Sequence, residues 1–318
     1  FNMKVLHRPT TEKMQLSPAT SAVFKVLAYY DVFKYPLTLP EIEKYATFRF
    51  HQLSEVEEAL GFLKERLIIF QFGEFYSLRN EFCLITRRTS GNLAAFNIYK
   101  KAQKRAALIH QFPFVRSVNI SGSLSKNYYD ESTDIDFFVM TKPGRLWLCR
   151  LLLTLYKKVF LFNSRKYFCI NYYVDTDHLE IPDKNLFSAT EIVTLRNMSG
   201  AAYYRQFITA NTWVNNYFPN HVENFPSALA AKDGMVKKAV ELFLGGNFGS
   251  FLDTRAQSLT RKFIRKKYNH ISPEHAEVNL RTHKSVSKHH PQGFQFKVLN
   301  EFDTICNAME EKHSVILL

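Results

Sequence analysis

Val118-Asn119-Ile120-Ser121-Gly122-Ser123, followed after a polar loop by Asp134-Ile135-Asp136-Phe137-Phe138-Val139-Met140, decides how the middle of this chain folds. The first stretch predicts an apolar strand that ends in a Gly-Ser turn. The second predicts a strand that opens with two carboxylates. Because side chains alternate along a strand, we expect Asp134 and Asp136 on the same face and close together.

This arrangement has a chemical consequence. Two like charges held this close favour a divalent cation between them. Gly122 permits close approach of the backbone to a ligand, and Ser123 with the neighbouring amides can hold a phosphate. A phosphate cradle beside paired carboxylates predicts metal-assisted phosphoryl or nucleotidyl transfer. Gly-Ser turns and Asp-x-Asp pairs are each common, so a solvated surface loop is the alternative for either one alone.

The same motif carries a family resemblance. Gly-Ser, about ten residues, then Asp-hydrophobic-Asp-hydrophobic resembles the polymerase-beta-like nucleotidyltransferase superfamily, over roughly residues 94–195. Its small members transfer a nucleoside monophosphate to antibiotics, proteins or nucleic acid ends. The resemblance implies that Asp134 and Asp136 bind two Mg²⁺ ions and that Gly122 and Ser123 contact the triphosphate of an NTP. Lys126 would assist as a positive charge, and the acceptor would be a small molecule, a protein or RNA.

The family pattern also includes a third carboxylate, on the strand after the next helix. We expect that helix over residues 145–162 and that strand over 167–174, where the central polar residue is Asn171. An amide cannot act as a base. Either Asn171 therefore replaces the third acid, or Asp175 or Asp177 reaches back from the following turn. A degenerate core that binds nucleotide or a partner without turnover is the alternative to a transferase.

Residues 1–85 predict a separate N-terminal domain. Ser17-Pro18 begins an apolar-periodic helix, and further helices are expected over 39–45 and 51–67. A hairpin around Gly73 follows. Three helices and a hairpin in this order resemble a winged helix-turn-helix domain.

The charges of the third helix argue against DNA binding. DNA affinity comes largely from Lys and Arg that neutralise phosphates. This helix carries more acidic than basic residues, namely Glu55, Glu57, Glu58 and Glu65 against Lys64 and Arg66. We therefore expect a structural or protein-docking role for the domain. A transcriptional regulator that reads DNA is the alternative.

The rest of the chain divides into a core over residues 92–187 and a helical region over 188–318, after a linker at Arg87–Asn92. The expected fold class is therefore α/β (α+β): a small mixed-sheet nucleotidyltransferase core, flanked by the winged-helix domain and the helical region. Residues 188–217 are expected to be mostly helical, residues 232–267 are expected to continue as helix, and a polar loop is expected over 283–291.

Basic residues gather in this helical region. The run Arg261–Lys267 is either a solvated helix end or a contact for phosphate or nucleic acid. In the polar loop, Lys284, Lys288 and His289 are the candidates for phosphate contact.

Charge and composition indicate which kinds of ligand and which cellular location the protein suits. The net charge is +13, of which residues 81–230 contribute +7 and residues 231–318 contribute +5, and this suits an anionic ligand. The four cysteines have no paired spacing, so we expect free thiols in a reducing cytoplasm. The most apolar stretch, Leu146–Phe162, contains Arg150, Lys157 and Lys158, so we expect no membrane span. No signal peptide is expected before the first element.

Overall fold

The computed structural model describes residues 13–223, 225 and 232–318, so the segment where a signal peptide would lie is outside the described residues. The chain is mixed α/β and divides into two compact units. The first unit holds the described residues up to Ile85, together with Asn216–His221 and Lys297–Leu318. The second holds Thr86–Asn215 and Val222–Phe296. Each unit combines segments from distant parts of the sequence. The sequence, by contrast, predicts three consecutive regions.

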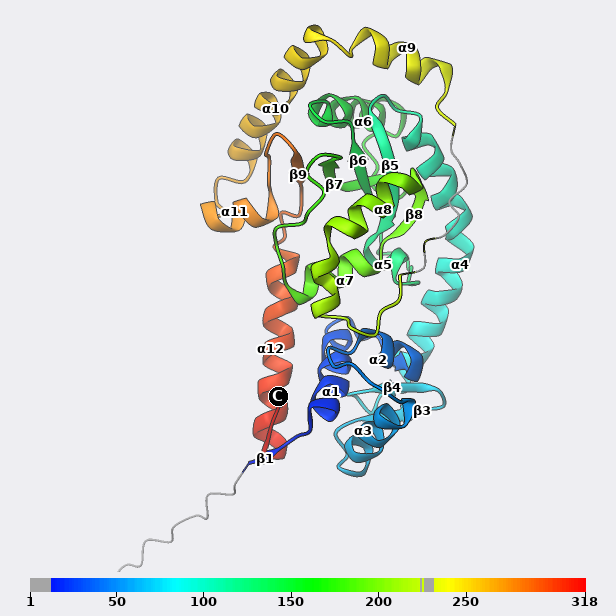
Figure 1. Ribbon diagram of the computed structural model, residues 1–318, viewed down its shortest axis with the longest axis vertical. Helices are drawn as coiled ribbons and strands as arrows, with labels where there is room; N and C mark the ends of the chain where they lie inside the picture. Colours follow the sequence, from blue (N-terminus) through cyan, green and yellow to red (C-terminus); the bar gives the residue numbers. More distant parts are fainter. Residues whose placement is uncertain (1–12, 224, 226–231) are drawn as a thin grey trace, which may run out of the picture. The chain divides into compact units, whose positions relative to one another are not determined.

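The N-terminal part of the first unit contains three helices and a small antiparallel sheet (Figure 1). Its elements are α1 (Pro18–Asp31), β2 (Leu37–Thr38), α2 (Leu39–Tyr45), α3 (Leu53–Glu65), β3 (Phe70–Phe72) and β4 (Phe75–Ser77), with strand order β2-β4-β3. The Ser17 hydroxyl accepts the Thr20 amide at 3.1 Å and so caps α1, as the sequence predicts. Gly73, at φ +59°, makes the hairpin turn between β3 and β4.

Both ends of the described chain belong to the first unit. β1 (Met14–Gln15) pairs in parallel with β10 (Val315–Ile316). The helix before β10, α12 (Phe294–His313), contributes its residues from Lys297 onward to this unit.

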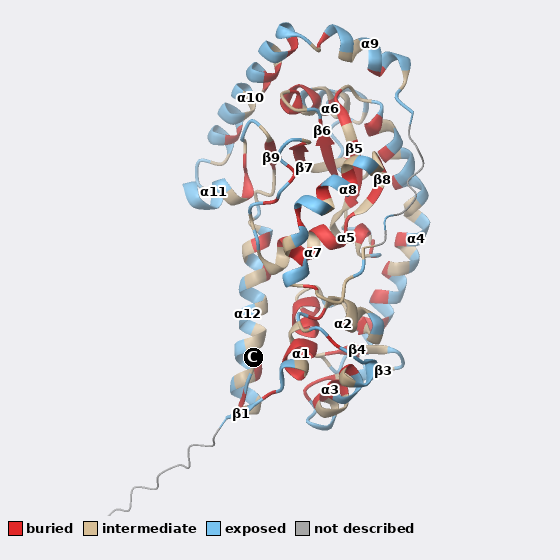
Figure 2. Ribbon diagram, viewed as in Figure 1, coloured by how far each residue is buried: buried red, intermediate tan, exposed pale blue. Residues whose placement is uncertain are grey.

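The second unit is built on a five-stranded mixed sheet in the order β8-β5-β6-β7-β9. Its strands are β5 (Val115–Ser121), β6 (Asp136–Thr141), β7 (Cys169–Asp175), β8 (Arg196–Ser199) and β9 (Val286–Lys288). β6 and β7 are parallel and are joined by α6 (Leu146–Phe160); the other neighbouring pairs are antiparallel. Figure 2 shows that the central strands are largely buried.

Helices cover both faces of this sheet. On one face, α6, α4 (Cys83–His110) and α10 (Asn247–Lys267) bury an apolar core, exemplified by Trp147 and Ala106, against Val118 and Phe137 of the strands. On the other face, Phe138 stacks on Tyr172 and contacts Phe207 of α8 (Ala201–Ala210). The side chain of Asp136 shares this second face, because it lies two residues before Phe138.

Four expectations about individual segments are wrong in whole or in part. The linker expected at Arg87–Asn92 is part of the continuous helix α4, where Gly91 packs against the Tyr128 ring. The stretch 188–217 is mostly helical as expected, with α7 (Leu186–Val193), α8 and a short 3₁₀ helix (Thr212–Asn216), but it also contains strand β8, which was not expected. The helix expected over 232–267 is interrupted at Gly245-Gly246, between α9 (Met235–Phe243) and α10.

The fourth concerns the polar segment 283–291, which was expected to be a loop. Its centre is β9, which pairs with β7 at the edge of the sheet. The sequence around Val286 does not predict a strand, because the segment is mostly polar and becomes a strand only by pairing with β7. In the part of the chain that the structure describes, no helix combines the length and the apolarity needed to cross a membrane.

Candidate functional site

The Gly-Ser turn and the carboxylates meet at one end of the central sheet. Ser121, the last residue of β5, pairs with Asp136, the first residue of β6. Gly122 follows at φ +65°, and a Cβ atom there would lie 2.5 Å from Oδ2 of Asp136. Both the backbone conformation and this close approach require glycine at position 122.

Asp134 lies just before β6, which begins at Asp136, so the pair brackets the start of the strand. Both side chains are half-buried. Ser123, also half-buried, is in the short helix α5 (Gly122–Ser125), where its carbonyl accepts the amides of Lys126 and Tyr128, each at 3.0 Å. The structure thus brings the predicted phosphate-binding and carboxylate residues to one place.

A β-bulge directs Asn171 toward Asp136. The register between β6 and β7 pairs Phe137 with Ile170 and Phe138 with Tyr172, which leaves Asn171 as the extra residue. The Asn171 amide donates to Oδ1 of Asp136 at 2.6 Å, and the thiol of Cys169 donates to Oδ1 of Asn171 at 3.0 Å. Asn171 therefore occupies the position beside Asp136 where the resemblance implies a third carboxylate.

The environment of Asp136 disfavours its charge. Burial raises the pKa of this carboxyl to about 6, and the charges of Asp134 and Glu191 act in the same direction. Hydrogen bonds from Cys169 and Asn171 oppose the shift without cancelling it. A cation bound at this carboxylate would relieve the repulsion from the two neighbouring carboxylates.

Cationic side chains hold the turn in place. The Lys126 ammonium lies 2.7 Å from Oε1 of Glu191 on α7 and donates to the carbonyl of Gly122 at 3.1 Å. Arg196 of β8 donates from Nε to the carbonyl of Ser125 at 2.8 Å. Lys126, predicted as a phosphate contact, is therefore also an anchor of the Gly-Ser turn.

The two alternative acids lie at the opposite end of β7. The parallel register pairs Asp136 with Cys169 at one end and Thr141 with Asp175 at the other. Asp175 accepts from the ring of His178 at 2.7 Å and from the amide of Asp177 at 3.1 Å. The structure therefore does not bring Asp175 or Asp177 to Asp136.

Strand β9 brings part of the basic segment beside the site. The amide of His289 donates to the carbonyl of Asn171 at 3.0 Å. Burial lowers the pKa of His289 to about 4, aided by the charges of Arg150, Arg165, His290 and Lys267. Burial, with the charge of Lys288, likewise lowers the pKa of His290 to about 4, and Glu191 opposes that shift. Both rings are therefore neutral at physiological pH.

The two predicted lysines of this segment have different environments. Lys288 is buried, with its ammonium 3.2 Å from Oδ2 of Asp183 and 3.0 Å from Oε1 of Gln295. Asp183 also pairs with Arg281 at 3.0 Å, so Lys288 belongs to a buried ionic cluster. Lys284, by contrast, is exposed, two residues before β9.

The donor set fits a Mg²⁺ ion that arrives with a nucleotide better than one held by the protein alone. Within the described residues, no three His, Cys, Asp or Glu side chains are grouped to hold a metal. Mg²⁺ is commonly bound by one or two carboxylates, with substrate phosphates and water completing its shell. Burial and the neighbouring carboxylates together disfavour the charged form of Asp136, so a bound cation would stabilise its carboxylate.

Glu191 and Arg196 were not singled out as site residues from the sequence. Both lie in the stretch expected to be mostly helical, whereas the break between α7 and β8 directs one to Lys126 and the other to the turn. Comparisons with family models, curated proteins and solved structures find no match to this chain.

Proposed function

We propose that this protein is a Mg²⁺-dependent nucleotidyltransferase, which moves a nucleoside monophosphate from an NTP to an acceptor and releases pyrophosphate. The observation that carries the proposal is the meeting of the Gly122 turn with Asp136, within van der Waals reach of each other, beside Asp134. The order of strands and helices in the second unit also agrees with the small mixed-sheet core that the sequence motif implies.

The chain's own groups have distinct roles in this proposal. Gly122 leaves room for the β- and γ-phosphates, and Ser123 contacts them. Lys126 and Arg196 fix the turn from the other side through their bonds to backbone carbonyls. Asp134 and Asp136 would hold Mg²⁺, which neutralises charge on the triphosphate when bound.

In the reaction, an acceptor oxygen attacks the α-phosphorus in line with the leaving group. The bond from that phosphorus to the bridging oxygen breaks, pyrophosphate departs with the electron pair, and the acceptor proton is released. Most of the rate would come from alignment and charge neutralisation. Asn171 cannot take the proton, so the proton acceptor is either solvent or a carboxylate such as Glu191.

One observation favours a second candidate, a core that binds nucleotide without turnover. The Asn171 amide bonds directly to Asp136 at 2.6 Å, so this carboxylate has a neutral partner where the resemblance implies an acid. A nucleotide-binding regulatory role would need the turn and the carboxylate pair but no third acid.

The first unit supports a docking role. Its three helices and hairpin agree with a winged-helix arrangement, with β2 joining the hairpin as a third strand. Glu57, Glu58 and Glu65 are exposed on α3, which is the helix that would enter the major groove. These charges would repel DNA phosphates, so we propose a protein partner for this unit.

The deciding experiment is thermal unfolding with ATP, GTP, CTP and UTP, with and without Mg²⁺, on wild type and Asp136→Asn. A ligand at one hundred times its Kd stabilises by about 2.7 kcal/mol. We expect Mg²⁺-dependent stabilisation by at least one nucleotide, and its loss in Asp136→Asn. Glu131→Gln, which removes an exposed carboxylate from the same loop, is the matched control and should behave as wild type.

Pyrophosphate release then separates the two candidates. Release that depends on an added small-molecule, protein or RNA acceptor supports the transferase. Nucleotide binding without pyrophosphate release under any of these conditions supports a core that binds nucleotide without turnover. Absence of stabilisation by all four nucleotides would contradict both.

A further inference from the structure

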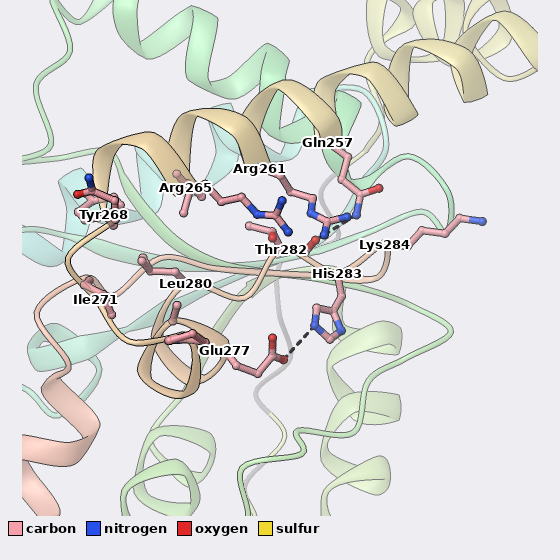
Figure 3. Close-up of a pocket in the computed structure, with 14 residues that line it drawn as sticks. Gln257, Arg261, Arg265, Tyr268, Ile271, Glu277, Leu280, Thr282, His283 and Lys284 are labelled. Atoms are coloured by element: carbon pink, nitrogen blue, oxygen red, sulfur yellow. Dashed lines mark hydrogen bonds and ion pairs between the residues drawn. The ribbon is translucent and has the colours of Figure 1, made fainter.

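A pocket of about 640 Å³ lies in the second unit, between α10, the short helix α11 (Pro273–Asn279) and the segment 280–284 (Figure 3). Its volume is in the range of pockets that enclose small organic ligands. It is connected to β9 through Tyr268, whose hydroxyl lies 3.4 Å from Nε2 of His289. None of its lining residues belongs to the Gly122–Asp136 turn.

Two arginines lie side by side in the wall of this pocket, and Lys284 adds a further positive charge to its lining. Arg261 and Arg265 lie four residues apart on α10, so they project from the same side of the helix. Figure 3 shows both guanidinium groups pointing from α10 into the space above Thr282 and Leu280. Both residues are exposed, and neither side chain makes a hydrogen bond or ion pair within the described part of the chain.

The acid across the pocket does not neutralise these arginines. Oε1 of Glu277 lies 2.9 Å from Nε2 of His283 and 3.4 Å from Nε of Arg281. Figure 3 shows the carboxylate turned toward His283. Among the described residues, the two guanidinium groups therefore have no counter-charge in the pocket, and guanidinium is the side-chain group best matched to the oxygens of carboxylate and phosphate.

The walls of the pocket are about equally polar and apolar. The apolar part consists of aliphatic side chains and one aromatic ring, namely Ile264, Tyr268, Ile271, Pro273, Ala276 and Leu280, and the polar part includes Gln257, Asn269 and Thr282. Gln257 is already engaged, because its amide donates to the carbonyl of Thr282 at 3.1 Å. An inorganic ion would leave these apolar walls in contact with water, whereas an organic anion would cover them.

We propose that this pocket binds a small organic phosphate, with the phosphate between Arg261 and Arg265 and the organic part against Tyr268 and Leu280. A phosphate monoester carries close to two negative charges above pH 7, which matches the two guanidinium charges. The proposal is independent of nucleotidyl transfer, since it concerns different residues and needs no metal.

The test is calorimetric titration of the full chain with phenyl phosphate and with inorganic phosphate, at pH 8 in EDTA. Phenyl phosphate should bind more tightly than inorganic phosphate, because its ring covers the apolar wall. The double variant Arg261→Gln/Arg265→Gln should weaken phenyl phosphate binding by about tenfold or more, since charge-assisted hydrogen bonds are lost. Repeating the titration in Asp136→Asn should give the wild-type affinity, which separates this pocket from the Gly122–Asp136 site.

The matched control is Lys262→Gln/Lys266→Gln. It removes two exposed positive charges from the same helix, each one residue from an arginine, and neither lysine lines the pocket. Its affinity for phenyl phosphate should stay within about twofold of wild type, because exposed charges at a distance contribute little. Neither double variant removes a recorded contact, so unchanged unfolding temperatures are expected for both.

Three results would overturn the proposal. The first is no binding of phenyl phosphate to wild type. The second is an equal loss in both double variants, which would reveal a diffuse electrostatic attraction. The third is tight binding of a single-stranded RNA oligonucleotide that depends on the two arginines while phenyl phosphate does not bind, which would make this surface a nucleic-acid contact instead.

Discussion

The Gly122–Asp136 site and the arginine pocket balance their charges in opposite ways. At the first, burial, with a smaller contribution from the neighbouring carboxylates, raises the pKa of Asp136 to about 6, while the nearby cations Lys126 and Arg196 are bonded to the chain itself. At the second, Arg261 and Arg265 face a cavity whose acid, Glu277, is paired elsewhere. The first site is therefore suited to a cation and the second to an anion.

Around strand β9, charges are balanced in a third way, by a buried cluster of cations and a carboxylate. Lys288 and Arg281 are cations like those of the pocket, but both are buried and share the carboxylate of Asp183. Some cations in this region of the sequence therefore form buried ion pairs, and others are available to a ligand. The difference is whether a buried carboxylate pairs with the cation, and the sequence alone does not show this.

The largest effect should come from Gly122→Ala, which breaks the first site and leaves the second intact. A side chain at φ +65° is strained, and its Cβ would meet Oδ2 of Asp136 at 2.5 Å. We expect the free energy of unfolding to fall by roughly 2 to 4 kcal/mol, from backbone strain and overpacking together. Chemical denaturation measures this, and nucleotide stabilisation should disappear while phenyl phosphate binding is kept.

Gly144→Ala is the control for that experiment. Gly144 has φ +67°, but nothing lies within 4 Å of a Cβ built there, so it carries the strain without the contact. Its cost should be about 1 to 2 kcal/mol. Equal costs at both positions would show that the close approach of Gly122 to Asp136 has no energetic importance.

The next effect concerns pH and the histidines that lie beside the first site. Folding lowers the pKa of His289 and His290 to about 4, so the unfolded chain binds more protons between about pH 6.5 and 4. Stability from these residues is therefore full above pH 6.5 and is lost as the pH falls toward 4, by up to about 3 kcal/mol for each histidine. Asp136 acts with the opposite sign, because its pKa is raised on folding.

Urea denaturation at pH 7.5 and 4.5 can isolate the histidine contribution. The double variant His289→Gln/His290→Gln should lose less stability than wild type between these two pH values. His270→Gln, which changes an exposed histidine after α10, should follow the wild-type dependence. A double variant as acid-sensitive as wild type would show that these two rings do not titrate as their burial requires.

A smaller effect is expected for Asn171→Asp, which tests whether the Gly122–Asp136 site lacks turnover because it lacks a third carboxylate. A carboxylate beside Asp136 adds repulsion, so without Mg²⁺ at pH 8 we expect a loss of about 1 to 2 kcal/mol in unfolding free energy. Added Mg²⁺ should recover this loss and should raise pyrophosphate release if the core lacks only its third acid. Asn171→Ala removes the same amide without adding charge, and Mg²⁺ should not restore its stability.

The contrast between the two sites also explains what the sequence could predict. Gly122 and Asp136 are close in the chain, and strand alternation with a turn residue is enough to place them together. Asn171 could be placed on the neighbouring strand, but its bulge depends on the register with β6. The helices and hairpin of the first unit were similarly predictable, because capping residues and periodicity are local signals.

The pocket could not be predicted in this way. Arg261 and Arg265 were recognised as part of a basic run that is either a solvated helix end or a contact for phosphate or nucleic acid, and Lys284 as a candidate phosphate contact in a loop, but the sequence did not bring them together. Their common position depends on the chain turning at α11 and returning through 280–284, which is set by packing between distant segments. The break of α9 from α10 at Gly245-Gly246 likewise depends on Arg145, which donates to both carbonyls at 2.6 and 2.9 Å.

The smallest expected effect tests whether Lys284 contributes to anion binding in the pocket. Figure 3 shows the Lys284 side chain extending away from Arg261 and Arg265, although the residue lines the pocket. Because it is exposed and points outward, Lys284→Gln should weaken phenyl phosphate binding by no more than about twofold. Calorimetry on this variant and on the arginine double variant gives the comparison directly. A tenfold loss for Lys284→Gln would move the anion to the mouth of the pocket, and the guanidinium pair would then not be its main support.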